Sequence, residues 1–181
     1  MTASLKAPKK TARRSRPFWK TKDMAAMTRK EWELLCDGCG RCCLHKLEDT
    51  ETKKIEFTDV SCKLLDCTNG RCSDYKNRQK KVPDCINLTA ELLPEMNCLP
   101  PTCAYVLIYK GKDLYWWHHL ISGRRATVHE AGISVVGKIE SEAGLTARQI
   151  ARRVVSWPKS RRAKSPAVSK KTTQSSARRK V

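Results

Sequence analysis

The sequence predicts an α+β, helix-rich fold: a small, irregular, metal-stapled single domain with disordered basic tails. Three observations support this prediction. Ten cysteines occur in 181 residues, and Cys36, Cys39, Cys42 and Cys43 all stand within the segment C-D-G-C-G-R-C-C. Short apolar segments alternate with turns that contain Gly or Pro. The formal charge of +19 comes from the two ends of the chain, because the region between them is nearly neutral.

The charge distribution also predicts the domain boundaries. Residues 1–22 carry eight Lys or Arg and no acidic side chain, and residues 148–181 carry twelve and none. Both ends are poor in large apolar residues, so they bury too little surface to offset the entropy lost on ordering. The expected parts are a disordered tail at 1–16, a cysteine-cluster domain at 17–147, a basic amphipathic helix at 148–157 and a second disordered tail at 158–181.

The first elements follow from capping and glycine signals. The pattern T-R-K-E from Thr28 is a capping box, and the helix that it begins should end near Cys36. Glycine weakens a helix by about 1 kcal/mol relative to alanine and adopts positive φ readily. Gly38 and Gly40 therefore predict a tight loop that aims backbone amides at sulfur. The alternating residues 54–58 predict an edge strand.

Short helices and turns are expected in the rest of the chain. The predicted helical segments are 75–81, 88–93, 103–109 and 145–157, and the predicted strand is 133–139. The turn sequences Asn69-Gly70 and Pro83-Asp84 place Cys72 and Cys85 at junctions between these elements.

The cysteines are better explained as metal ligands than as disulfides. The first twenty residues contain no apolar segment of signal-peptide length, and no run of eighteen apolar residues occurs, so we expect a cytoplasmic protein without a membrane span. In a reducing compartment, dense cysteines indicate metal ligands or catalytic thiols. Thiolates suit Zn²⁺ and iron–sulfur clusters, and two-residue spacers let successive sulfurs converge. An isolated residue such as Cys98 is more simply a small buried apolar side chain.

The segment C-D-G-C-G-R-C-C-L-H-K-L-E-D, preceded by E-W-E-L-L, resembles the YcgN-like bacterial cysteine-cluster proteins. These belong to the wider CxxCxxCC group, which is described as zinc- or iron-chelating. Further matching segments are F-T-D-V-S-C, R-C-S-D-Y, P-D-C-I-N-L-T and L-P-P-T-C-A-Y. The resemblance implies a small cytoplasmic bacterial protein in which Cys67 and Cys98 lie outside the pattern. The metal ligands that it implies are Cys36, Cys39, Cys42, Cys43, Cys62, Cys72, Cys85 and Cys103.

Eight thiolates suffice for two four-ligand sites, either two zinc centres or two 4Fe–4S clusters. A single cluster with spare cysteines and a bridged multi-zinc site are alternatives. The two successive C-x₂-C steps resemble the start of a ferredoxin ligand run, although its x₃-C-P continuation is absent. This spacing favours an Fe–S cluster over Zn²⁺. Arg41, Lys46 and Arg71 lie near ligands in sequence and could offset thiolate charge, and His45 is the histidine nearest the cluster.

The sequence leaves three classes of function open. No P-loop, GxSxG, HExxH or dinucleotide-binding motif occurs, so the cysteine cluster is the candidate for any chemistry. We expect a metal-binding cysteine-cluster protein. Related CxxCxxCC domains are linked to flagellin lysine methylation, so the resemblance also allows a cluster-dependent enzyme of methyl or electron transfer. The basic tails allow a metal-stabilised module that binds nucleic acid non-specifically through counterion release.

Overall fold

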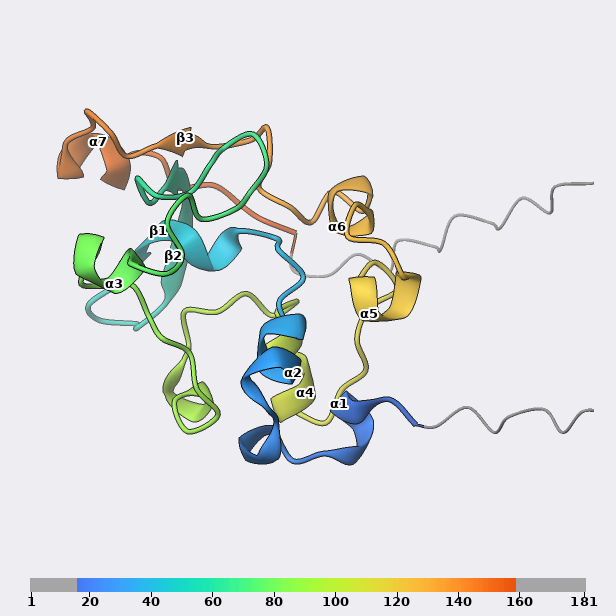
Figure 1. Ribbon diagram of the computed structural model, residues 1–181. Coiled ribbons are helices and arrows are strands. Elements are labelled where there is room, and N and C mark those ends of the chain that lie inside the picture. The colour runs from blue at the N-terminus through green and yellow to red at the C-terminus, as the bar shows by residue number, and fades with distance from the viewer. Residues whose placement is uncertain (1–15, 159–181) are drawn as a thin grey trace, which may run out of the picture.

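The computed structural model describes residues 16–158, which form short α-helices, 3-10 helices and one small sheet (Figure 1). The α-helices are α1 (Phe18–Thr21), α2 (Arg29–Leu34), α3 (Arg78–Lys81), α4 (Ala104–Tyr109), α5 (His119–Ser122), α6 (Thr127–Glu130) and α7 (Ala147–Ala151). The 3-10 helices are η1 (Met24–Ala26), η2 (Arg41–Cys43) and η3 (Leu93–Glu95). None of the helices in this range is long and apolar enough to cross a membrane.

The described chain is a mixed α and β structure in which turns and loops predominate. A fold of both helices and strands is therefore confirmed, whereas the expected richness in helix is not. The predicted disordered tails lie almost wholly outside the described residues, so their state stays a prediction.

The sheet contains β1 (Leu44–Glu48), β2 (Ile55–Ser61) and β3 (Glu140–Ser141) in the order β1-β2-β3. β1 pairs with β2 antiparallel, and β2 pairs with β3 parallel. The strand predicted at 54–58 is confirmed as part of β2. It is the central strand rather than an edge strand, because β3 and Val154, which bridges to Thr58, cover its second side.

α2 and α4 pack against each other and position the start of the cysteine loop. The capping box is present: the Thr28 backbone N–H donates to Glu31 Oε2 at 2.9 Å. Tyr105 on α4 donates its hydroxyl to the Trp32 carbonyl at 3.0 Å, and the two rings lie 4.8 Å apart. Both predicted helices are therefore confirmed, and Leu35, directly before the first cysteine, is fully buried.

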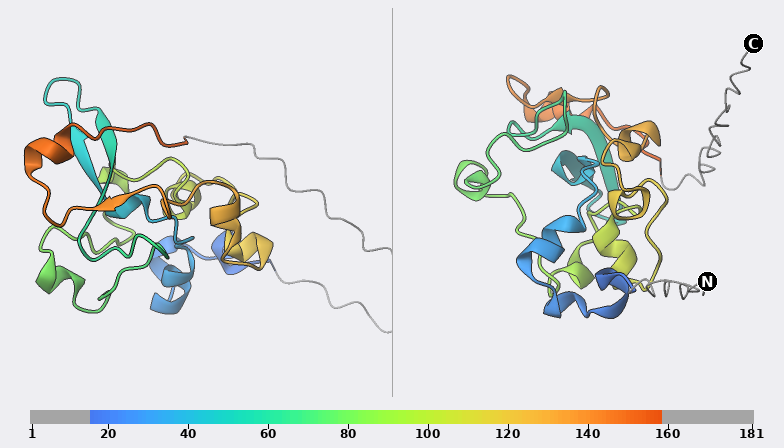
Figure 2. Two further views of the ribbon diagram at one scale, coloured as in Figure 1. Left: turned by 90° about the horizontal axis from the view of Figure 1, so that it is seen from above. Right: turned by 45° about the vertical axis from the view of Figure 1, so that its right-hand side comes forward.

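The cysteine loop 36–43 lies between this helix pair and the sheet (Figure 1). Figure 2 shows from two further directions that the sheet and the α2–α4 pair occupy different ends of the molecule. Three small apolar clusters surround the loop, and they are centred on Leu35, on Trp117 and on Leu44. Cys39 belongs to the Trp117 cluster and is buried, whereas Cys36 and Cys42 are exposed, so the loop lies partly in the core and partly at the surface.

The strand predicted at 133–139 is wrong. Gly132 and Gly137 have φ of +71° and +72°, so the backbone turns directly before this apolar segment and again within it. The Val135 amide donates to the Cys39 carbonyl at 2.9 Å instead of joining a ladder. The segment is apolar because it packs against the cysteine loop, and that non-local contact replaces strand pairing.

The one or two helical turns predicted within 75–81 are confirmed by α3, which is a single turn. The short helix predicted at 88–93 is absent: this segment is a turn that leads into η3. An isolated six-residue helix is unstable in water, so nearby contacts decide whether it forms.

The helix predicted at 145–157 ends at Ala151, because the following residues pair with β2. Val154 bridges to Thr58, and the Arg153 guanidinium contacts both carboxylate oxygens of Asp59 at 2.7 and 3.0 Å. Pairing and ion contacts with the sheet therefore override the helical periodicity of this segment.

Candidate metal centre

The loop that carries the four clustered cysteines depends on two glycines. Gly38 and Gly40 both have a φ of +77°, a conformation that side chains with Cβ rarely adopt. A Cβ on Gly40 would also lie 2.6 Å from Cγ2 of Val135. The tight loop predicted from the glycines is therefore confirmed, and it delivers Cys42 and Cys43 to η2.

Backbone amides point at the sulfurs, as the glycine pattern predicted. In three predicted ligands, the amide two residues downstream lowers the pKa of the thiol and favours its thiolate form. The cysteine–amide pairs are Cys36–Gly38, Cys39–Arg41 and Cys103–Tyr105. The Leu64 amide also donates to Cys62 Sγ, at 3.5 Å. Such donors stabilise negative charge on sulfur, and a metal–thiolate site needs the same stabilisation.

Cys42 and Cys43 form the closest sulfur pair in the loop. Their Sγ atoms lie 3.9 Å apart. The hydrogen bond from Cys43 lowers the pKa of Cys42 to about 7, and the positive charge of Lys46 acts in the same direction. The same hydrogen bond, together with burial, raises the pKa of Cys43. Of the two, Cys42 is therefore the readier thiolate.

Cys42 is also the centre of a first set of thiols. The pKa of Cys36, Cys39 and Cys103 is raised, and burial is the largest cause for the buried Cys39 and for Cys103, whose pKa reaches about 12. Repulsion from the Cys42 thiolate contributes in all three. The packing of α4 on α2 brings Cys103, at the start of α4, to a loop that is sixty residues away in the chain.

Cys43 begins a second set. Repulsion from Cys62 adds to the raised pKa of Cys43, and the Cys62 amide donates to the Cys43 carbonyl at 2.9 Å. Burial raises the pKa of Cys85, and repulsion from Cys62 and Cys72 adds to it. Cys62 therefore acts on Cys43 and Cys85, whereas Cys42 acts on Cys36, Cys39 and Cys103 and also on its neighbour Cys43.

The remaining two cysteines have other surroundings. Cys67 lies 3.6 Å from the Ser61 hydroxyl, and none of the repulsions described above comes from Cys67 or Cys98. All ten cysteines are free thiols. Among residues 16–158, no group of three or more His, Cys, Asp or Glu side chains has the spacing of a metal-holding site. The assignment of ligands therefore stays a prediction, although the thiols and amides fit a thiophilic metal.

Comparison with known proteins identifies the family. Residues 35–104, a range that spans all ten cysteines, match the CxxCxxCC family model described as "Putative zinc- or iron-chelating domain". A UPF0260 protein of Granulibacter bethesdensis is 57% identical over 144 residues, which cover 78% of this chain and 84% of that protein. This chain belongs to the UPF0260 family. Its bacterial relatives include UPF0260 proteins of Agrobacterium fabrum, 57% identical over 142 residues (78% and 88% covered), and Brucella melitensis, 59% identical over 124 residues (68% and 82% covered). No solved structure matches the chain.

Arg41 in this UPF0260 protein is a buried cation next to the cysteines. Its side chain is 1% exposed, and Nη1 donates to the Pro158 carbonyl at 2.7 Å. Its Nε and Nη2 atoms are buried without a hydrogen-bond partner in the described part of the chain. Burial lowers the pKa of Arg41, and the negative charge of Cys39 opposes this effect. From the sequence, Arg41 was one of three basic residues near the ligands. Its burial makes it the strongest of the three candidates for offsetting thiolate charge.

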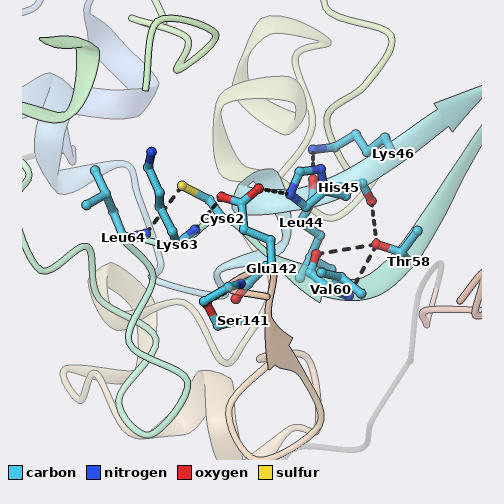
Figure 3. Close-up of polar contacts among 12 residues, drawn as sticks. Leu44, His45, Lys46, Thr58, Val60, Cys62, Lys63, Leu64, Ser141 and Glu142 are labelled. Atoms are coloured by element: carbon cyan, nitrogen blue, oxygen red, sulfur yellow. Dashed lines mark hydrogen bonds and ion pairs between the residues drawn. The ribbon is translucent and has the colours of Figure 1, made fainter. Parts of the chain in front are cut away.

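His45 contacts a carboxylate rather than a sulfur. Its Nε2 lies 2.7 Å from Glu142 Oε2, and Glu142 Oε1 accepts the Lys63 amide at 2.6 Å beside Cys62 (Figure 3). Glu142 therefore links β1 to the segment that carries Cys62. The sequence contains no signal for this contact, because the two residues are 97 positions apart.

His118 is a second residue that the sequence did not single out for the site. It is buried, its Nε2–H donates to the Leu35 carbonyl at 2.9 Å, and its Nδ1 accepts the Leu120 amide at 3.1 Å. Burial lowers the pKa of His118, so the neutral ring is favoured. The imidazole therefore fastens the start of α5 to the backbone directly before Cys36.

Proposed function

We propose that this protein binds a thiophilic metal, as an iron–sulfur cluster or as Zn²⁺, through eight cysteine thiolates. The Cys42–Cys43 pair carries the proposal, because its sulfurs lie 3.9 Å apart and Cys42 acts electrostatically on Cys36, Cys39 and Cys103. Amides directed at sulfur and a buried guanidinium supply the stabilisation that clustered negative thiolates require. The family description, zinc- or iron-chelating, supports the same function.

We further infer that the thiolates form two four-ligand sites. The first would use Cys36, Cys39, Cys42 and Cys103, and the second Cys43, Cys62, Cys72 and Cys85. Matched variants in the two sets test this division. Cys36→Ser and Cys85→Ser should each remove about half of the bound metal if the sites are independent. A single bridged centre, which the short Cys42–Cys43 contact allows, would lose all its metal in either variant.

The metal itself is tested by purifying the full chain under anaerobic conditions. The C-x₂-C-x₂-C-C spacing favours an iron–sulfur cluster, so we expect a brown protein that contains iron and sulfide and absorbs light at about 400 nm. A colourless protein with stoichiometric zinc would assign the sites to Zn²⁺. The proposed function is wrong if the chain binds no more iron or zinc than a variant in which all eight predicted ligands are serine.

The charge of the two ends supports a second function, non-specific binding of nucleic acid. Twenty Lys or Arg and no acid lie in residues 1–22 and 148–181, and such segments bind phosphate backbones through counterion release. Deletion of residues 1–16 and 159–181 should abolish salt-dependent retention on DNA while leaving the metal content unchanged. Retention that survives the deletion would contradict this function.

A further inference from the structure

A basic hollow opens beside the cysteine loop. Its volume is about 450 Å³, and three basic side chains, Arg71, Arg125 and His129, line it. Its other walls come from the turn at Thr68 and Asn69 and from small apolar residues, so no carboxylate lines it. Residues 23–147 have nearly equal numbers of acidic and basic side chains, so a hollow with basic groups alone is a local feature.

The turn that presents Arg71 is held by its own carboxylate. Asp66 accepts hydrogen bonds from the Thr68 amide at 2.8 Å, the Thr68 hydroxyl at 2.6 Å and the Asn69 side chain at 2.6 Å. The Asp66 amide donates to the Arg71 carbonyl at 2.8 Å. Gly70 sits within this turn with a φ of +70°. The Asp66 carboxylate therefore stabilises the turn that carries Arg71.

The other two basic side chains are Arg125, just before α6, and His129, on α6. The acidic residue of this helix, Glu130, pairs with Arg124 at 2.5 Å. The Thr127 hydroxyl donates to the Trp117 carbonyl at 2.5 Å and anchors the helix to the core. The acidic residue of α6 is thus paired with an arginine outside the hollow, and His129 lies on a helix that is anchored to the core.

The charges of the two arginines are not compensated by the protein. Within residues 16–158, neither the Arg71 nor the Arg125 guanidinium has a hydrogen bond or an ion pair. Burial is the main cause of the lowered pKa of His118 and His119, and the positive charge of Arg125 lowers both values further. Both side chains are solvent-exposed, so their guanidinium groups are accessible to a bound anion.

We propose that this hollow binds a phosphate group, either as free phosphate or as the monoester of a small molecule. Arg71 and Arg125 would contact its oxygens, since a guanidinium offers two parallel N–H donors to such an oxyanion. The volume lies within the range of small-molecule pockets and leaves room for an organic group on the phosphate.

The position of the hollow relates it to the cysteines. Arg71 directly precedes Cys72, and a Cβ on Gly70 would lie 3.6 Å from the Gly38 carbonyl, inside the loop between Cys36 and Cys39. A phosphate ligand would therefore bind next to both sets of thiols. The proposal concerns a ligand beyond the metal and does not depend on which metal is bound.

Calorimetric titration of the full chain with inorganic phosphate, at fixed ionic strength, tests the site. We expect saturable one-to-one binding, which Arg71→Gln and Arg125→Gln each weaken about tenfold or more, because each removes a charge-assisted contact. Arg29→Gln is the matched control: it removes an exposed arginine of α2, outside the hollow, and should change the affinity less than about twofold.

Two results would overturn the proposal: wild-type protein that shows no saturable binding, or equal losses in all three variants, which would indicate attraction to the net charge alone. Glycerol phosphate is titrated in parallel. Tighter binding than inorganic phosphate identifies an ester as the ligand, and equal or weaker binding identifies free phosphate. Metal content and thermal unfolding are measured for every variant, so a failure of phosphate binding is separable from loss of metal and from misfolding.

Discussion

Cys39→Ser separates the two roles that the structure gives to a buried cysteine. The side chain is 8% exposed and packs in the cluster that contains Trp117, Val128 and Ile133. Serine has nearly the same shape, but its hydroxyl is a poor ligand for a thiophilic metal. The substitution therefore changes packing slightly and ligation strongly, and the two effects can be measured apart.

The two magnitudes differ enough to be resolved. Placing a hydroxyl in this apolar cluster costs about 1–3 kcal/mol, and that cost applies with or without metal. A structural four-thiolate zinc site contributes about 10–16 kcal/mol of apparent binding free energy, which folding and binding share. We therefore expect Cys39→Ser to lower the free energy of unfolding by about 1–3 kcal/mol in the metal-free protein, and by several kcal/mol more in the metal-loaded protein.

Anaerobic urea denaturation with and without a chelator measures both quantities, and elemental analysis gives the metal content. The chelator should destabilise the wild type strongly and Cys39→Ser much less. Cys98→Ser is the matched control, because it makes the same chemical change at a partly exposed cysteine outside the predicted set. It should stay within about 0.5 kcal/mol of the wild type and respond fully to the chelator.

The reasoning is refuted if Cys39→Ser keeps the wild-type metal content and loses the same stability with and without chelator. Cys39 would then be a packing residue alone. Equal loss of metal in Cys39→Ser and Cys98→Ser would show instead that the division between ligands and other cysteines is wrong.

Three further predictions concern charge and protonation near the cysteines. Arg41→Met loses a charge-assisted bond to Pro158 but also removes two buried unpaired donors, so metal-free stability should change by less than about 2 kcal/mol. Its metal affinity, measured by chelator competition, should fall at least about tenfold, and an unchanged affinity would contradict the charge-offset role. The pKa of Cys103 is raised from 9.0 to about 12 by burial, so the protonated thiol contributes stability below about pH 9 that is lost as the pH rises toward 12. The urea midpoint of the metal-free protein should therefore fall between about pH 9 and pH 12. A midpoint that does not change over this pH range would contradict the burial of the Cys103 thiol. His118→Ala removes the hydrogen bond to the Leu35 carbonyl and the cap of α5. We therefore expect the free energy of unfolding, measured by urea denaturation, to fall by about 2–4 kcal/mol. A fall below about 1 kcal/mol would show that the Leu35 carbonyl and the Leu120 amide find other hydrogen-bond partners.

Local signals predicted the elements that depend on local chemistry. The capping box at Thr28 predicted α2, and Gly38 and Gly40 predicted the tight loop, because both effects act within a few residues. The apolar segment 133–139 was wrongly predicted as a strand, since its apolar character comes from packing on the cysteine loop. Hydrophobicity indicated that this segment is buried but did not indicate its partner.

The arrangement of the candidate site was harder to predict from the sequence than the conformation of the loop 36–43. Spacing and family resemblance supplied the predicted ligands, but their division depends on α4 packing against α2 and on β2 ending beside Cys43. The burial of Arg41 depends on Trp157 and Pro158, which return to the loop from the end of the described chain. No periodicity in the sequence encodes contacts over such separations, so these features required the structure.

The size of the elements gives a physical reason to expect that folding and metal binding are coupled. No α-helix among residues 16–158 exceeds six residues, and isolated helices of that length are unstable in water. The apolar residues are divided among three small clusters rather than one large core. Domains with little continuous core usually rely on cross-links or metals, and the predicted ligands follow α2, follow β2, precede α4 or lie in the turns between these elements. A metal bound by these ligands would fix several elements at once, so its binding energy would appear as folding energy of the whole unit.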